Sequence, residues 1–292
     1  MTDLTTAAEF EALVERHDLF LFDCDGVIWH GNEPIGKAVQ LIAMLQARGK
    51  TCVFVTNNAT KSRETYVAKF AKMGVTVQES HIYSGAYAAA RYLSAIGFKR
   101  RVYCAGEPGL AHELKQAGLL MAEQSHLDRL PATPSEAFDP SLIAPDDVGA
   151  VVIGFNQFFN YRLLSFAHHV LFRKPDNVFI ATNLDPQMPH GPDQLWPGGG
   201  ALVAALRCST EREPHVTGKP SKLMFDLIKQ EFHVDPARTV MFGDRLTTDV
   251  LFGLNSGTTT VLVLSGVETR ETLAQSNIRP HFIMNSAGEF CE

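Results

Sequence analysis

Continuous apolar runs alternate along this chain with stretches of helical spacing, and this alternation limits the possible folds more than any other feature. Such runs are typical of strands buried on both faces of a parallel sheet. The runs read as strands are 19–23, 51–57, 101–106, 149–155, 177–183, 239–244 and 258–266. Helical stretches between them, such as 36–49 and 62–74, end at glycine, as helices often do. The sequence therefore predicts an α/β fold with a parallel sheet.

Polar side chains stand at the ends of several predicted strands, although these ends lie far apart in the sequence. The residues concerned are Asp23, Asp25, Thr56, Asn57, Asn58 and Asp244. Ligands of open α/β sheets bind beyond the carboxyl ends of the strands. We therefore expect these residues to contribute to one shared site.

The middle of the chain has strands and helices of its own but no comparable acidic strand end. We therefore predict an inserted domain at 85–198 and a core domain made of residues 1–84 and 199–292. Residues 124–147, rich in proline and acids, are predicted to form an exposed loop.

Charge and composition exclude several classes of protein. A formal net charge of −6 argues against non-specific binding to nucleic acid or to an anionic membrane surface. The chain has no apolar run of 18 residues and no apolar signal-peptide core at its start, so we expect no membrane span. Its five scattered cysteines fit a reducing compartment better than a disulfide framework. We expect a cytoplasmic protein.

The paired acids Asp23 and Asp25 fit the chemistry of phosphate transfer. A carboxylate at a strand end can attack phosphorus and form an aspartyl-phosphate. Gly26 permits a sharp bend that turns Asp25 toward the leaving group, where it can donate a proton and later activate water. Two carboxylates repel a phosphate dianion, so a cation is required, and Mg²⁺ with Asp244 as a further ligand fits. An isolated pair of this kind more often caps a turn.

Three further motifs change that balance. Thr56 offers a hydroxyl beside backbone N–H groups that suit phosphate oxygens, although such a segment also makes turns and helix caps. Lys219 precedes an amphipathic helix and is the cation needed against phosphate, whereas a lone lysine there is usually solvated. Asp249 follows Asp244 by five residues, in the first turn of a predicted helix, where it also complements the helix dipole.

The motifs DCDG, TNN, GKP and GDRLTTD occur in this order along the chain. Together they resemble the haloacid dehalogenase superfamily of phosphatases. Segments such as GVIWHGNEPIGKA, FVTNNATKSRETY and ATNLDPQMP are similar to its phosphoglycolate phosphatase, pyridoxal phosphatase and 4-nitrophenylphosphatase branch. The resemblance covers essentially the whole chain. It implies a Rossmann-like parallel-sheet core with an inserted α/β cap, and the activity of a phosphoric monoester hydrolase.

The resemblance also implies a role for each matching residue. Asp23 would be the nucleophile and Asp25 the general acid and base. One Mg²⁺ per subunit would be held by the Asp23 side chain, the Asp25 backbone carbonyl and Asp244, with Asp249 supporting them. The phosphoryl group would be bound by Thr56, Asn57 and Lys219, in a loop shaped by Asn58.

The cap is expected to restrict the substrate to a small phosphorylated metabolite. Side chains of segment 183–197 are expected to contact this substrate. Within that segment Asn183 and Asp185 are expected to form turns. Pyridoxal phosphatases carry a histidine in this cap segment that meets the pyridine ring, whereas this chain has Met188 after its DPQ residues and His190 two residues later. We therefore expect a phosphoglycolate-type or broad 4-nitrophenyl phosphatase. If the chain forms a homodimer, we expect the cap to make the contact.

Alternative functions use the same site. Pyridoxal phosphate or a phosphoprotein could be the substrate, and a phosphotransferase would pass the phosphoryl group to an alcohol. A haloacid dehalogenase needs neither Asp25 nor a metal. A scaffold with a decayed site would have lost one of Asp23, Asp25, Lys219 or Asp244, and all four are present.

Overall fold

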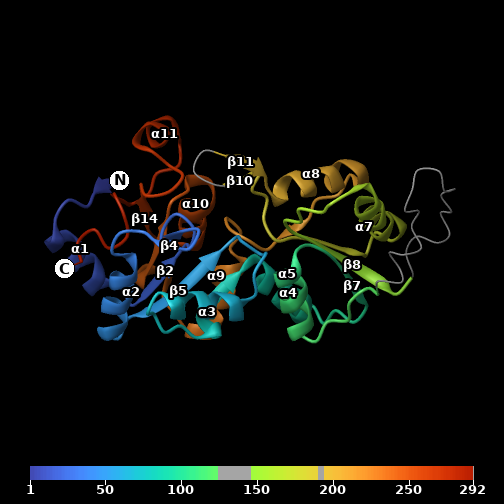
Figure 1. The fold of residues 1–292 in the computed structure, drawn as a ribbon, viewed down its shortest axis with the longest axis horizontal. Coiled ribbons are helices and arrows are strands. Elements are labelled where there is room, and N and C mark those ends of the chain that lie inside the picture. The colour runs from blue at the N-terminus through green and yellow to red at the C-terminus, as the bar shows by residue number, and fades with distance from the viewer. Residues whose placement is uncertain (124–145, 190–193, 292) are drawn as a thin grey trace. The chain divides into compact units, whose positions relative to one another are not determined.

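The computed structural model describes residues 1–123, 146–189 and 194–291 and forms two compact units (Figure 1). The first unit comprises residues 1–56, 63–84 and 219–292, and the second comprises residues 57–62 and 85–218. Most of the predicted exposed loop at 124–147, and also His190, lie outside the described residues.

The first unit is built on a seven-stranded sheet in the order β1-β15-β14-β13-β2-β5-β6. Its strand pairings are all parallel. The strands are β1 (Thr2–Asp3), β2 (Leu19–Phe22), β5 (Thr51–Thr56), β6 (Ile82–Ser84), β13 (Thr239–Gly243), β14 (Thr259–Val263) and β15 (Phe282–Met284). This parallel sheet with its connecting helices confirms the predicted α/β class.

Helices cover this sheet, and a short hairpin follows its first long strand. The helices are α1 (Ala7–Arg16), α2 (Ala38–Ala47), α3 (Arg63–Lys72), α9 (Leu223–Phe232), α10 (Leu251–Ser256) and α11 (Arg270–Gln275). The hairpin is formed by β3 (Trp29–His30) and β4 (Glu33–Pro34). A π-helical turn, Leu246–Val250, leads into α10. Buried aromatic rings fill the core, and the Phe54 and Phe70 centroids lie 4.2 Å apart.

The second unit has its own parallel sheet, in the order β12-β9-β8-β7. The strands are β7 (Arg101–Ala105), β8 (Val148–Ile153), β9 (Val178–Ala181) and β12 (His215–Val216). One apolar cluster joins this sheet to α7 (Tyr161–Arg173) and α8 (Gly199–Thr210), and another joins it to α4 (Gly85–Ala95) and α5 (Pro108–Gln116). An antiparallel hairpin pairs β10 (Gln187–Pro189) with β11 (Leu195–Pro197).

The limits of the second unit differ from the predicted insertion at 85–198. Helix α8 lies beyond residue 198, but its buried Val203 and Leu206 pack in one cluster with Phe166 of α7. Residues 57–62 also belong to this unit, and the Gly109 backbone N–H donates to the Thr60 carbonyl at 3.1 Å. Packing and hydrogen bonds, which sequence patterns do not show, set these limits. A role of this unit in substrate specificity, and dimer formation through it, stay predictions.

Every apolar run predicted as a strand forms one. Among the described residues, the strands that sequence patterns missed are short: β1, β3, β4 and β12 have two residues each, and β6, β10, β11 and β15 have three each. So few residues give no recognisable period. Among the described residues, none of the helices is long and apolar enough to cross a membrane.

Candidate active site

Three neighbouring strands at the centre of the first sheet end in predicted site residues. Asp23 follows β2, Asp244 follows β13, and Thr56 is the last residue of β5. β2 lies between β13 and β5, and all three run parallel. The Asp23 backbone N–H donates to the Phe242 carbonyl at 2.9 Å, so the hydrogen bonds between β2 and β13 extend as far as Asp23. The polar strand ends therefore meet at one edge of the sheet.

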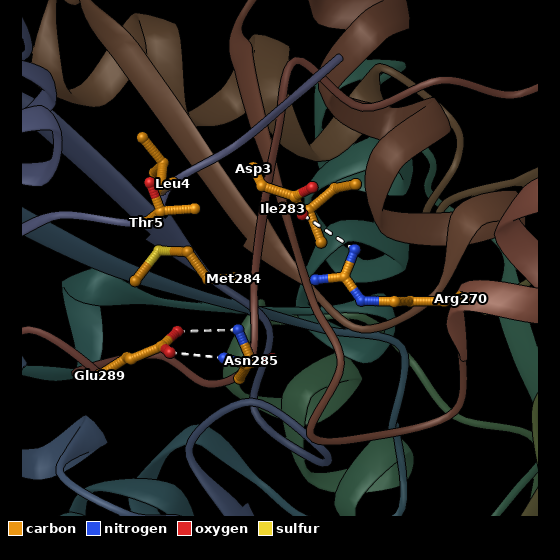
Figure 2. A pocket seen from close by; sticks show the side chains of 8 residues that line it. All are labelled: Asp3, Leu4, Thr5, Arg270, Ile283, Met284, Asn285 and Glu289. Atoms are coloured by element: carbon orange, nitrogen blue, oxygen red, sulfur yellow. Dashed lines mark hydrogen bonds and ion pairs between the residues drawn. The ribbon is translucent and has the colours of Figure 1, made fainter.

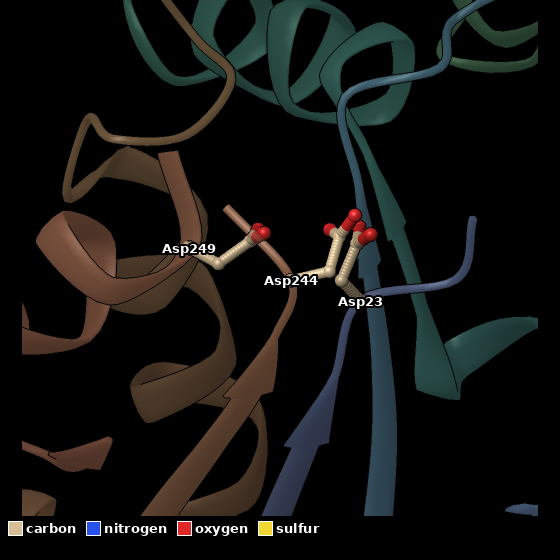
Figure 3. A group of neighbouring side chains, drawn as sticks. All are labelled: Asp23, Asp244 and Asp249. Atoms are coloured by element: carbon tan, nitrogen blue, oxygen red, sulfur yellow. The ribbon is translucent and has the colours of Figure 1, made fainter. Parts of the chain in front are cut away.

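Asp23, Asp244 and Asp249 form a buried acidic cluster at this edge (Figure 3). One carboxylate oxygen of each residue lies within 4.8 Å of those of the other two. The π-helical turn brings Asp249 to the cluster, where its Oδ2 accepts from the Arg245 backbone N–H at 3.1 Å. Asp244 Oδ2 accepts from the Val267 N–H at 2.8 Å.

Gly26 lets the chain pass close to this cluster. Its φ is +88°, in the left-handed region that favours glycine, as the predicted bend requires. A Cβ atom at this position would lie 2.4 Å from Asp244 Oδ2. Any larger residue would therefore displace Asp244 and strain the turn.

Lys219 connects the acids with a single buried ammonium group. Its Nζ donates to Asp23 Oδ1 at 2.5 Å and to the Val55 carbonyl at 2.8 Å, and it lies 2.7 Å from Asp249 Oδ1. Burial alone would lower the pKa of Lys219, but the two carboxylates outweigh it and raise the pKa above its ordinary value. Lys219 therefore stays charged.

One lysine does not neutralise three buried carboxylates. Burial is the main cause that raises the pKa of Asp23 well above its ordinary value, opposed by Lys219 and reinforced by Asp249 and Asp244. Burial and the Asp249 carboxylate raise the pKa of Asp244 to about 7. The surplus negative charge and the all-oxygen donors fit a hard divalent cation such as Mg²⁺.

Asp25 differs from these acids because its side chain is exposed. Its Oδ1 accepts a hydrogen bond from the Trp29 indole Nε1 at 2.9 Å. Trp29 was not among the site residues predicted from the sequence. Its position four residues after Asp25 was a signal that could have been used, although the contact depends on the tight turn between the two residues.

Thr56 is buried at the end of β5, and its side chain hydrogen-bonds with the Tyr66 hydroxyl of α3. Tyr66 was also missed, because its helical stretch gives no sign of which strand end it meets. The next two residues, Asn57 and Asn58, belong to the second unit. Asn58 Oδ1 accepts from the Thr60 N–H at 3.1 Å and from its hydroxyl at 2.7 Å, so Asn58 shapes its own loop.

Asn57 connects its loop to a segment more than 120 residues later. Its Nδ2 donates to Asp185 Oδ2 at 3.1 Å, and its carbonyl accepts from Asn183 Nδ2 at 2.8 Å. The Asp185 N–H donates to Asn183 Oδ1 at 3.1 Å, which is the expected Asx turn. Asn183 and Asp185 therefore form a turn and also hold the Asn57 loop, a link that sequence patterns did not indicate.

A pocket of about 400 Å³ opens elsewhere on the first unit and contains none of the predicted site residues (Figure 2). Its charged groups are paired within it: Arg270 contacts Asp3 at 3.0 Å, and the Asn285 N–H donates to Glu289 at 2.9 Å. Such a pocket lacks the convergent unpaired groups of a catalytic site.

Comparisons with known proteins agree with this geometry. The family model of haloacid dehalogenase-like hydrolases matches residues 20–120, and a second, HAD-hydrolase-like model matches residues 216–290. The chain is 40% identical over 286 residues to the chloroplastic phosphoglycolate phosphatase 1A of Arabidopsis thaliana, covering 96% of this chain and 78% of the relative.

Two solved structures have a similar fold. The p-nitrophenyl phosphatase from Archaeoglobus fulgidus is 32% identical, with a TM-score of 0.80 over 93% of this chain and 97% of that one. The glycerol phosphate phosphatase from Mycobacterium tuberculosis, solved in complex with magnesium, is 27% identical, with a TM-score of 0.78 over 95% of this chain and 77% of that one.

Proposed function

We propose that this chain, which belongs to the haloacid dehalogenase-like hydrolases and is a phosphatase, hydrolyses small phosphate monoesters through a phosphorylated Asp23. The observation that carries the proposal is the contact of Lys219 with both Asp23 and Asp249, beside Asp244, at the carboxyl edge of the sheet. In this arrangement the carboxylate that we propose as the nucleophile lies beside a fixed positive charge, which supports the binding of a phosphate.

The reaction would proceed in two transfers. An oxygen of Asp23 attacks phosphorus while the ester bond breaks, and Asp25 gives its proton to the departing oxygen. Asp25, now ionised, takes a proton from a water molecule that attacks the aspartyl-phosphate. Inorganic phosphate leaves and the Asp23 carboxylate is restored. Lys219 and Thr56 bind the phosphoryl oxygens in both steps, and family resemblance adds Asn57 to them.

Magnesium fits the acidic cluster of Asp23, Asp244 and Asp249. We propose one ion per subunit, held by the Asp23 side chain, the Asp25 backbone carbonyl and Asp244, with Asp249 in support. The bound ion supplies the positive charge that lets a phosphate dianion approach these carboxylates. The magnesium complex of the similar phosphatase from Mycobacterium tuberculosis supports this assignment.

Removal of divalent cations by excess EDTA should abolish hydrolysis of p-nitrophenyl phosphate, and added Mg²⁺ should restore it. Binding can be measured separately, because an ion that binds only the folded protein raises its thermal midpoint. We expect Mg²⁺ to raise the midpoint of the wild type and to have a smaller effect on Asp244→Asn. Full turnover in excess EDTA would exclude the metal assignment.

Substrate choice is proposed to favour a small phosphorylated carboxylate such as phosphoglycolate over pyridoxal phosphate. Met188, in β10, is half-buried and pairs with Trp196 of β11. A thioether offers an adaptable apolar contact and no directed hydrogen bond to a pyridine ring. The phosphoglycolate phosphatase among the relatives supports this ranking.

We expect kcat/KM to be higher for phosphoglycolate than for pyridoxal phosphate, and Met188→His to narrow the gap. One pocket contact contributes roughly 10- to 200-fold at most. Gln187→His is the matched control, because adjacent residues of a strand point to opposite faces. A wild-type preference for pyridoxal phosphate would overturn the ranking.

A phosphoserine peptide and an alcohol acceptor in the same assays would detect the protein phosphatase and phosphotransferase alternatives.

A further inference from the structure

The indole of Trp29 supports Asp25 from inside the protein. The Trp29 ring is fully buried, whereas the Asp25 side chain is exposed. The hydrogen bond from Nε1 to Asp25 Oδ1 is 2.9 Å long. An indole N–H can only donate, so its partner oxygen must act as the acceptor.

A tight backbone turn fixes the position of Trp29 relative to Asp25. The Ile28 and Trp29 N–H groups both point to the Cys24 carbonyl, at 2.9 and 3.2 Å. The Gly26 N–H donates to the Trp29 carbonyl at 2.9 Å, and Asp25 and Trp29 form an isolated β-bridge. The two side chains are therefore held in register by the main chain between them.

Three side chains of helix α3 contact the Trp29 ring. The Phe70 ring meets it edge-on with centroids 5.0 Å apart, and the Tyr66 ring lies nearly parallel to it at 6.3 Å. The Lys69 ammonium lies 3.7 Å from the ring centroid and donates to the Gly31 carbonyl at 2.5 Å. A cation over the ring face adds attraction. The indole therefore has little freedom to move away from Asp25.

We propose that Trp29 is a positioning residue that decides which oxygen of Asp25 transfers the proton. In a protonated carboxyl group the carbonyl oxygen is the better acceptor, so the indole N–H favours Oδ1 as that oxygen. The proton then resides on Oδ2, which gives it to the leaving group and later takes one from water. This inference rests on the proposed function, because it requires Asp25 to be the general acid and base.

If Trp29 has this role, the loss of kcat/KM in Trp29→Phe should depend on the leaving group of the substrate. This change removes the N–H and keeps an aromatic ring. The value of kcat/KM reports the transfer of the phosphoryl group to Asp23. In that step the alkoxide that leaves phosphoglycolate must be protonated, whereas p-nitrophenolate leaves with little need for a proton. We expect kcat/KM for phosphoglycolate to fall roughly 10- to 100-fold, because Asp25 becomes ionised as it gives up its proton and one hydrogen bond to a charged group has that size. For p-nitrophenyl phosphate we expect a change below about threefold.

Phe70→Leu is the matched control, because it disturbs the packing of the same ring and keeps the N–H. We expect it to change both substrates by the same factor. The ratio of the two kcat/KM values in one sample does not depend on the fraction of folded protein, so a destabilised variant still gives an answer. Equal losses for both substrates in Trp29→Phe would overturn the inference.

Variants of Asp25 separate this inference from the proposed function. Asp25→Asn should lower kcat/KM for phosphoglycolate by roughly 10²–10⁴-fold. Adding Trp29→Phe to it should produce no further leaving-group effect, because the tryptophan acts through Asp25. If Asp25→Asn leaves the ratio of the two kcat/KM values unchanged, the acid role of Asp25 is wrong. If Asp25→Asn changes this ratio and Trp29→Phe does not, only the positioning role of Trp29 is wrong.

Discussion

Replacement of Asp23 by Asn is expected to abolish turnover and to preserve the fold. The amide has nearly the size of the carboxylate but cannot form the covalent intermediate. Its carbonyl oxygen can still accept the hydrogen bond that Lys219 now donates to Asp23 Oδ1. Burial is the first cause of the raised pKa of Asp23, and it makes an ionised side chain at this position unfavourable for the stability of the folded protein. We therefore expect the thermal midpoint to stay equal or to rise.

Steady-state hydrolysis of p-nitrophenyl phosphate and thermal unfolding together test this prediction. Asp226→Asn makes the same chemical change on an exposed residue of α9 and should retain full activity. The aspartyl-phosphate itself can be sought by mass spectrometry of acid-quenched wild-type protein. Near wild-type turnover in Asp23→Asn would show that another group attacks phosphorus.

Replacement of Lys219 by Met should lower activity and stability together. The methionine keeps an apolar stem of similar length but removes the charge that contacts Asp23 and Asp249. Loss of one preorganised charge at a phosphoryl group costs roughly 10²–10³-fold in kcat. Removal of one partner from a buried pair destabilises a protein by about 3–5 kcal/mol. Unlike Asp23→Asn, this variant should therefore melt well below the wild type.

The matched control is Lys222→Met, three residues later on the surface. We expect it to change neither the thermal midpoint nor kcat. Unchanged kcat in Lys219→Met, despite a lower thermal midpoint, would restrict Lys219 to a structural role. An unchanged thermal midpoint would instead mean that the acids do not depend on this ammonium group.

The fold class was predictable because parallel strands buried on both faces must be continuously apolar. All the strands at the centre of the first sheet carry that signal, including β2, β5 and β13. The expected end of the insertion at residue 198 did not match the compact units. Helix α8 has the same helical pattern whichever sheet it packs on, and only the contacts of Val203 and Leu206 place it in the second unit.

The candidate site was predictable to the extent that its residues stand at strand ends. Asp23, Thr56 and Asp244 could be selected because parallel strands bring their carboxyl ends to one edge. Asn57 and Asn58 were selected by the same rule, yet their side chains bind within the second unit. Trp29 and Tyr66 carried no such signal, because a tight turn brings Trp29 to Asp25 and the position of α3 brings Tyr66 to Thr56.

The sequence by itself determined the local chemistry of this protein: apolar strands, a glycine that can bend, and acids and a lysine placed where chain direction changes. Tertiary structure alone decided which of these groups meet. The order β13-β2-β5 sets Asp244 beside Asp23, and the π-helical turn brings Asp249 to Lys219. Periodicity reports which face of an element is buried, but not its neighbour. Distances between side chains depend on that neighbour, because charge and hydrogen-bond interactions act over a few ångströms.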